Sequence, residues 1–177
     1  MTGRWTIAAL ATFLGTAPLR AQQQAPPSPC ARDSLYRRFD FWIGEWDVTP
    51  AGHPETVVGH SVVQRIAVGC GLLENWTASN GGEGKSLNGY NRSLGHWEQF
   101  WIGGGGAVTE YRQSIWIGDT LVYLAHSITP QGAPFMQRLS FSPLDANTVR
   151  QFEQISTDEG LTWTVGYDFI YHRKKSG

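Results

Sequence analysis

Apolar and polar residues alternate through most of the chain after residue 44, with short clusters of Gly, Pro, Asn and Asp between the alternating runs. A period of two between side chains on one face is typical of β-strands, and Val, Ile and aromatic residues favour them. The pattern predicts about ten strands, over residues 45–48, 56–68, 72–79, 86–92, 96–102, 108–117, 121–128, 135–141, 149–155 and 161–172.

The predicted connections are short, so consecutive strands should pair as antiparallel neighbours. Ten such strands would expose long edges unless the sheet closes on itself. Residues 31–43 differ, because Leu35, Tyr36, Phe39 and Trp42 have the spacing of a short helix. We therefore expect an all-β fold, an up-and-down antiparallel β-barrel with a short N-terminal helix. A two-sheet sandwich is the competing arrangement, although it needs longer crossovers.

Composition limits the function classes. The chain has 177 residues, 41% of them hydrophobic, and a formal net charge of -1. This length suits one domain, and the charge lacks the basic excess with which proteins capture nucleic acid. We expect no nucleic-acid partner.

The N-terminus resembles a targeting segment rather than part of the fold. Arg4 precedes an uncharged, mostly apolar run over residues 5–19, and Ala21 precedes a polar Gln run. This order is typical of a secretory signal peptide, and the run is short for a membrane span. We predict a signal peptide at 1–21, a Pro/Gln-rich linker at 22–29 and a barrel domain at 30–177. The protein would be secreted or periplasmic, with no stable membrane insertion after cleavage; an uncleaved anchor is the alternative.

Secretion changes the interpretation of the two cysteines. Cys30 follows the linker, and Cys70 lies between two predicted strands. In an oxidising compartment such a pair usually forms a disulfide. A redox or metal pair is the alternative, but the spacing is not CxxC. We predict a Cys30–Cys70 disulfide.

Several short motifs carry a family resemblance. They occur at residues 39–47 (FDFWIGEWD), 87–90 (LNGY), 97–101 (WEQFW), 149–151 (VRQ) and 158–163 (DEGLTW). These runs resemble the DUF1579-like family of bacterial lipocalin-like (calycin-type) proteins, over about residues 39–173. The resemblance implies a calycin-type barrel with a central cavity, and no particular activity. Nitrobindin-like haem barrels are more distant and have a fuller Gly-x-Trp-x-Gly opening, so no cofactor is expected.

Residues that share a strand face supply the candidate site. A cavity for a small molecule combines apolar and aromatic walls with a few polar groups. Alternation groups Trp97 with Gln99 and Trp101, for example. The predicted ligand-binding residues are Glu74, Trp76, Trp97, Gln99, Trp101, Gln151 and Tyr167. Alternatively, these aromatics are ordinary core and the polar residues face water.

Signals for other chemistry are weak. The five histidines form no HxH or HxxxH pair, so no metal site is expected. The Gly-rich segment 79–86 imitates a phosphate-binding loop, but it leads into a strand rather than a helix. No spacing marks a catalytic pair or triad, so the catalytic residues are unknown.

These observations favour a secreted or periplasmic lipocalin-like protein that binds a small apolar or aromatic molecule in its barrel. An enzyme acting on a hydrophobic small molecule in the same cavity is one alternative. A non-catalytic interaction module is another, because Phe100, Ile102 and Phe152 lie on the opposite strand faces and would suit a homodimer.

Overall fold

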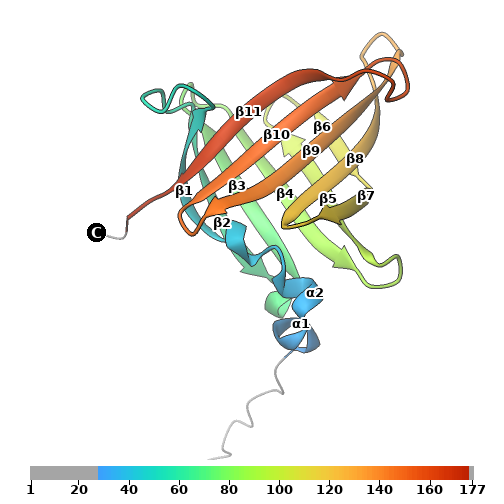
Figure 1. Ribbon diagram of the computed structural model, residues 1–177. Helices are drawn as coiled ribbons and strands as arrows, with labels where there is room; N and C mark the ends of the chain where they lie inside the picture. Colours follow the sequence, from blue (N-terminus) through green and yellow to red (C-terminus); the bar gives the residue numbers. More distant parts are fainter. Residues whose placement is uncertain (1–27, 176–177) are drawn as a thin grey trace, which may run out of the picture.

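The computed structural model describes residues 28–175, and the predicted signal peptide lies outside them. One antiparallel sheet curls into a nearly closed barrel (Figure 1). Its strands are β1 (Gly44–Pro50), β2 (Gly59–Ile66), β3 (Gly71–Ala78), β4 (Glu83–Asn91), β5 (His96–Gly103), β6 (Val108–Tyr111), β7 (Gln113–Ile117), β8 (Thr120–Ile128), β9 (Pro134–Asp145), β10 (Thr148–Ser156) and β11 (Thr164–Arg173). The predicted all-β, up-and-down barrel is confirmed.

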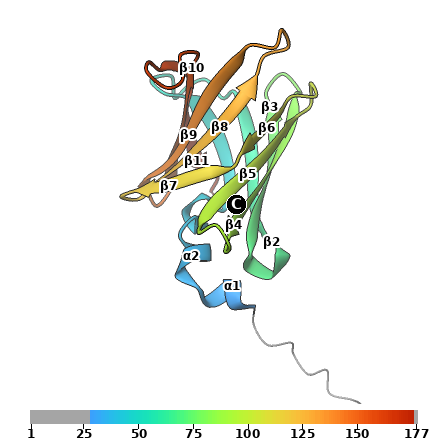
Figure 2. The same cartoon turned by 90° about the vertical axis from the view of Figure 1, so that its right-hand side faces the viewer.

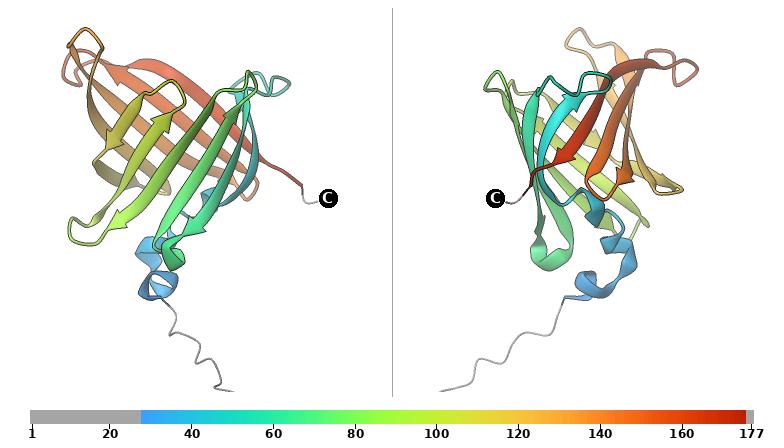
Figure 3. Two further views of the ribbon diagram at one scale, coloured as in Figure 1. Left: turned by 180° about the vertical axis from the view of Figure 1, so that it is seen from behind. Right: turned by 60° about the vertical axis from the view of Figure 1, so that its left-hand side comes forward.

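Consecutive strands pair with each other except β6 and β7, which are the two edge strands of the sheet, and β1 also pairs with β11. The strand order is β6-β5-β4-β3-β2-β1-β11-β10-β9-β8-β7. Figure 3 shows from two sides that β3, β4 and β5 form one wall, with β9, β10 and β11 across from it. Side chains on the inner faces of these walls therefore meet inside the barrel.

The barrel closes through one segment, residues 108–117, which the sequence predicts as a single strand. It is divided at Arg112: β6 pairs with β5, whereas β7 pairs with β8 on the other side. Where β7 diverges from β5, the Ser114 hydroxyl accepts a hydrogen bond from the Trp97 amide at 3.0 Å and donates one to the Trp97 carbonyl at 2.8 Å. Between β5 and β7, the Ser114 side chain thus replaces the backbone hydrogen bonds of a paired strand.

A short N-terminal region covers one end of the barrel (Figure 2). It contains α1 (Pro29–Arg32), α2 (Ser34–Arg37) and the 3-10 turn η1 (Asp40–Trp42). The predicted short helix is thus divided into three pieces. Within residues 28–175, no helix is both long enough and apolar enough to cross a membrane.

Aromatic side chains fill the covered end. Trp42 and Phe39 stack with ring centroids 5.1 Å apart, and Phe141 lies 4.5 Å from Trp42. The indole N–H of Trp46 donates to the Trp42 carbonyl at 3.0 Å. All four side chains are fully buried, so this end of the barrel is a solid core.

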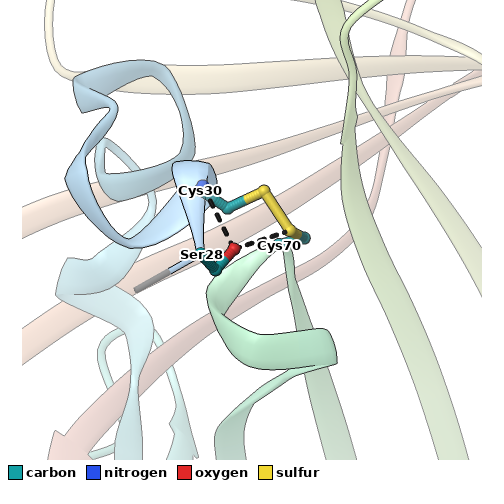
Figure 4. Close-up of a disulfide and its surroundings, with 3 residues drawn as sticks. All are labelled: Ser28, Cys30 and Cys70. Carbon is teal, nitrogen blue, oxygen red and sulfur yellow. Dashed lines mark hydrogen bonds between the residues drawn. A yellow bond between two sulfur atoms is a disulfide. The ribbon is translucent and has the colours of Figure 1, made fainter. Parts of the chain in front are cut away.

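The predicted disulfide is present between Cys30 and Cys70. It joins α1 to the β2–β3 connection at the covered end (Figure 4). The Ser28 hydroxyl accepts a hydrogen bond from the Cys30 amide at 3.3 Å and lies 3.6 Å from Cys70 Sγ. Ser28 and Pro29, the last two residues of the expected linker, lead into and begin α1.

A β-bulge changes one strand face that alternation alone would predict. Glu153 pairs with Tyr167, but Gln154 pairs with Val165, so Gly166 is an extra residue in β11. Tyr167 therefore faces the interior, whereas Val165 is 62% exposed. The sequence pattern groups Val165 with Tyr167 on one face, and the bulge makes that grouping wrong.

Candidate ligand-binding cavity

A cavity of about 470 Å³ occupies the half of the barrel away from the N-terminal helices. Its volume falls within the range of small-molecule sites, about 300–1,000 Å³. It is lined by Glu74, Trp76, Gln99, Trp101, Ala107, Thr109, Tyr111, Gln137, Leu139, Gln151, Glu153, Tyr167, Phe169 and Tyr171. Exposed Ala107, in the β5–β6 connection, marks the end at which the cavity meets solvent.

Six of the seven residues predicted for ligand binding line this cavity: Glu74, Trp76, Gln99, Trp101, Gln151 and Tyr167. The seventh, Trp97, shares their strand face but lies deeper, in the aromatic core. It is 1% exposed and packs edge-on against Phe39, with centroids 5.5 Å apart. The structure thus brings six of these residues together and places Trp97 beneath them.

Glu74 is buried at the inner part of the cavity and is surrounded by hydroxyl groups. Ser61 and Tyr171 donate hydrogen bonds to its Oε1 at 2.8 and 3.2 Å. Ser86 donates to Oε2 at 3.0 Å. Burial raises the pKa of Glu74, and these hydrogen bonds oppose the rise. Both carboxyl oxygens are therefore engaged by the protein itself.

Amide side chains extend this polar layer across the barrel. The Asn88 amide nitrogen donates to Ser86 Oγ at 3.0 Å. Its amide oxygen accepts from Gln99 at 2.8 Å and from the Tyr123 hydroxyl at 3.2 Å. The Tyr171 hydroxyl also lies 2.9 Å from the Gln151 amide oxygen, so its single proton is shared between Glu74 and Gln151. The network gives Glu74, Ser86 and Asn88 hydrogen-bond partners and forms a polar boundary between the aromatic core and the cavity.

Glu153 is the second buried carboxyl group of the cavity, and only one of its oxygens is engaged. Oε1 accepts from the Tyr111 hydroxyl at 3.2 Å and from the Gln137 amide at 3.0 Å. Oε2 takes no hydrogen bond from any residue of 28–175 and lies beside Gly166, where a Cβ would come within 2.5 Å of it. Burial raises the pKa of Glu153 as well. The side chain is 7% exposed and lines the cavity with a free acceptor.

Two tryptophans are placed by the same local pattern. Trp76 lies against Gly59, and Trp101 lies against Gly84; a Cβ at either glycine would overlap the indole ring. In both strands the glycine is followed two positions later by a serine, Ser61 or Ser86, that donates to Glu74. Each Gly-x-Ser segment therefore makes room for an indole and binds the buried carboxyl.

Stacked rings continue the apolar wall. Trp76 and Phe169 are nearly parallel with centroids 6.3 Å apart, and Phe169 stacks on Tyr167 at 4.7 Å. The cavity lining contains no Lys, Arg or His. Within residues 28–175 no three His, Cys, Asp or Glu side chains gather in a way that could hold a metal ion. The chemistry available is hydrogen bonding, aromatic contact and two carboxyl groups.

The site also contains residues beyond the predicted set. Alternation could have found Glu153, two positions after Gln151, and Phe169 and Tyr171, which follow Tyr167 at the same spacing. No sequence pattern marked Tyr111 or Gln137. They reach the cavity because of how β6 and β9 are placed in the barrel.

No protein-family model matches the sequence, and comparison with curated proteins finds no match either.

Proposed function

We propose that this protein binds a small molecule with an apolar or aromatic body in the cavity of its barrel. The observation that carries the proposal is the cavity itself, about 470 Å³ in volume and lined by aromatic and polar side chains. A barrel whose purpose was only structural would be filled by side chains, as its covered end is. A preformed cavity that combines stacked rings with a few polar groups is the usual form of a small-molecule site.

We further propose that the protein works outside the cytoplasm, as a secreted or periplasmic lipocalin-like protein related to the DUF1579-like family. The Cys30–Cys70 disulfide supports an oxidising compartment. The signal-peptide pattern in residues 1–21 supports export, and the nearly closed antiparallel barrel is compatible with a calycin-like fold.

Native mass spectrometry of protein exported by its host tests both proposals. The intact mass should show loss of residues 1–21, and mild activation should release a bound small molecule. Chains that retain the N-terminus would contradict the proposal of export.

A fluorescent reporter tests the cavity directly. The neutral aromatic dye N-phenyl-1-naphthylamine should brighten on binding to the wild-type protein. Ala107→Trp should abolish this response by filling the entrance. Ala133→Trp is a matched control, because both alanines are exposed and accept a backbone hydrogen bond from the residue four positions earlier. Equal binding by both variants would place the dye outside the cavity and contradict the proposal.

A homodimer is a second proposal, supported by the outer face of β4, β5 and β6. Leu87 pairs with Phe100 there, and Ile102 pairs with Val108. All four side chains are exposed, and contiguous exposed apolar residues often mark interaction sites. Light scattering should give twice the monomer mass for the wild type and the monomer mass for Phe100→Ser. A monomeric wild type would contradict this proposal.

A further inference from the structure

Two carboxyl groups line the cavity, and no positively charged side chain of the lining balances them. Glu74 comes from β3 and Glu153 from β10, and the lining provides no Lys, Arg or His. Buried carboxylates are ordinarily paired with a cation or held neutral. A purely apolar ligand would leave this pair of groups unexplained.

The geometry points to a protonated amine as the ligand's polar group, with an N–H donated to Oε2 of Glu153. This inference rests on the proposed function, since it names the class of molecule that the cavity binds. Glu74 already accepts hydroxyl hydrogen bonds on both of its oxygens, so it offers no free acceptor to a ligand. Glu153 keeps Oε2 free, and the missing side chain at Gly166 leaves room for that oxygen.

The aromatic wall completes a site for such a ligand. Trp76, Trp101 and Tyr167 line the same cavity as Glu153. Aromatic faces attract ammonium groups through the ring quadrupole, by more when the pair is removed from water. The same rings provide flat apolar contact for the rest of the molecule. An organic amine with an aromatic or apolar body therefore uses every class of group in the lining.

Amine binding should be coupled to proton release. The titratable groups that line the cavity are Glu74, Glu153, Tyr111, Tyr167 and Tyr171. Burial raises the pKa of each of them, so the tyrosines stay neutral and the carboxyl groups hold protons more readily than in water. An ammonium group would displace a proton from a carboxyl group, so the affinity for amines should rise with pH while the affinity for neutral molecules should not.

Ligands that share an aromatic body and differ in the charge and type of their polar end group provide the test. Calorimetric titrations would compare phenethylamine, 2-phenylethanol and phenylacetate, and then tryptamine, tryptophol and indole-3-acetate. We expect each amine to bind at least tenfold more tightly than its alcohol at pH 8, and the acids to bind most weakly. The tenfold preference should shrink at pH 5.5, and the amine's binding enthalpy should depend on the buffer through proton release.

The variants Glu153→Gln and Glu45→Gln separate the site from general charge effects. Glu153→Gln should remove the preference for amine over alcohol and leave alcohol binding in place. Glu45→Gln changes an exposed carboxylate on the outer face of β1 and should leave the preference intact. The titrations of the wild-type protein with the six compounds test the amine inference even where a variant folds poorly. Alcohols or acids that bind as tightly as the amines would overturn the amine inference while supporting a ligand-binding cavity; no binding by any of the six compounds at millimolar concentration would overturn both.

Discussion

The guanidinium of Arg173 lies over the indole ring of Trp46, with 4.2 Å between Cζ and the ring centroid. The same group donates hydrogen bonds to the carbonyls of Ile43 at 2.7 Å, Phe41 at 3.2 Å and Ala146 at 3.3 Å. One side chain near the end of the last strand thus connects the first strand, the turn before it and the β9–β10 connection. It fastens the covered end of the barrel.

Arg173→Lys should destabilise the fold, because an ammonium cannot reproduce three separate hydrogen bonds and a planar stack. We expect the free energy of unfolding to fall by about 2 kcal/mol, the scale of losing hydrogen bonds from a charged donor. Urea denaturation followed by tryptophan fluorescence measures it. Arg92→Lys, in the exposed β4–β5 turn, is the control and should change stability little. Equal losses in both variants would show that Arg173 has no special structural role.

The disulfide should contribute stability without shaping the cavity. It closes a loop between residues 40 positions apart, for which loop-closure entropy gives about 3–4 kcal/mol. The double variant Cys30→Ser/Cys70→Ser should lose about this much stability under oxidising conditions. Addition of reductant should destabilise the wild type and leave the variant unchanged. A variant as stable as the oxidised wild type would contradict the prediction.

The double cysteine variant should keep its affinity for cavity ligands at temperatures where it is folded. The reason is position: Cys70 lies in the β2–β3 connection at the covered end (Figure 4), whereas the cavity opens at the other end, near Ala107. The N-phenyl-1-naphthylamine titration measures this affinity. A large loss of affinity in a folded variant would show that the two ends of the barrel are coupled.

On β5, alternation predicted which residues share an inner face but not how deep each one lies. Trp97, Gln99 and Trp101 occupy one face of β5, as their spacing predicts. Gln99 and Trp101 reach the cavity, but Trp97 is covered by Phe39 from the N-terminal segment. How deeply a side chain of β5 lies in the barrel depends on the N-terminal segment that packs into the covered end. The sequence of residues 96–102 alone contains no information about that packing.

Two other features depend on how neighbouring strands pair. Residues 108–117 have the alternation of one strand, yet the chain divides at Arg112 because its two halves pair with different neighbours. The bulge at Gly166 likewise reverses the expected face of Val165. Neither feature is visible in the local alternation of apolar and polar residues, so the sequence predicted the direction and approximate number of the strands better than where each strand ends and which way its side chains point.

Glu74 should make stability depend on pH. Burial raises its folded-state pKa above the ordinary value of 4.5, so the folded protein holds this proton more tightly than the unfolded chain does. The associated stability is present below pH 4.5 and is lost as the pH rises through the folded pKa. Glu74→Gln has no proton to lose at this position, so it does not lose this stability as the pH rises. The free energy of unfolding of the variant minus that of the wild type should therefore increase with pH, by at most about 1.4 kcal/mol per pH unit.

Urea denaturation at intervals from pH 4.5 to 8 measures this difference. Glu45→Gln is the control, since its exposed side chain should give a difference that hardly changes with pH. A constant difference between Glu74→Gln and wild type across the range would show that the folded protein does not shift this carboxyl group.

Gly84 should be intolerant of a side chain because Trp101 lies against it. A Cβ at this position would overlap the indole ring, whereas a Cβ at Gly89, on the same strand, would meet nothing within 4 Å. Gly84→Ala should therefore displace Trp101 and destabilise the protein by about 1–3 kcal/mol, as overpacking does. Gly89→Ala should be neutral or stabilise the protein by about 0.5 kcal/mol, because alanine restricts the unfolded chain. Urea denaturation gives both values, and near-ultraviolet circular dichroism reports the displaced indole. Similar stabilities and spectra for the two variants would mean that the Gly-x-Ser segment of β4 does not determine where Trp101 lies.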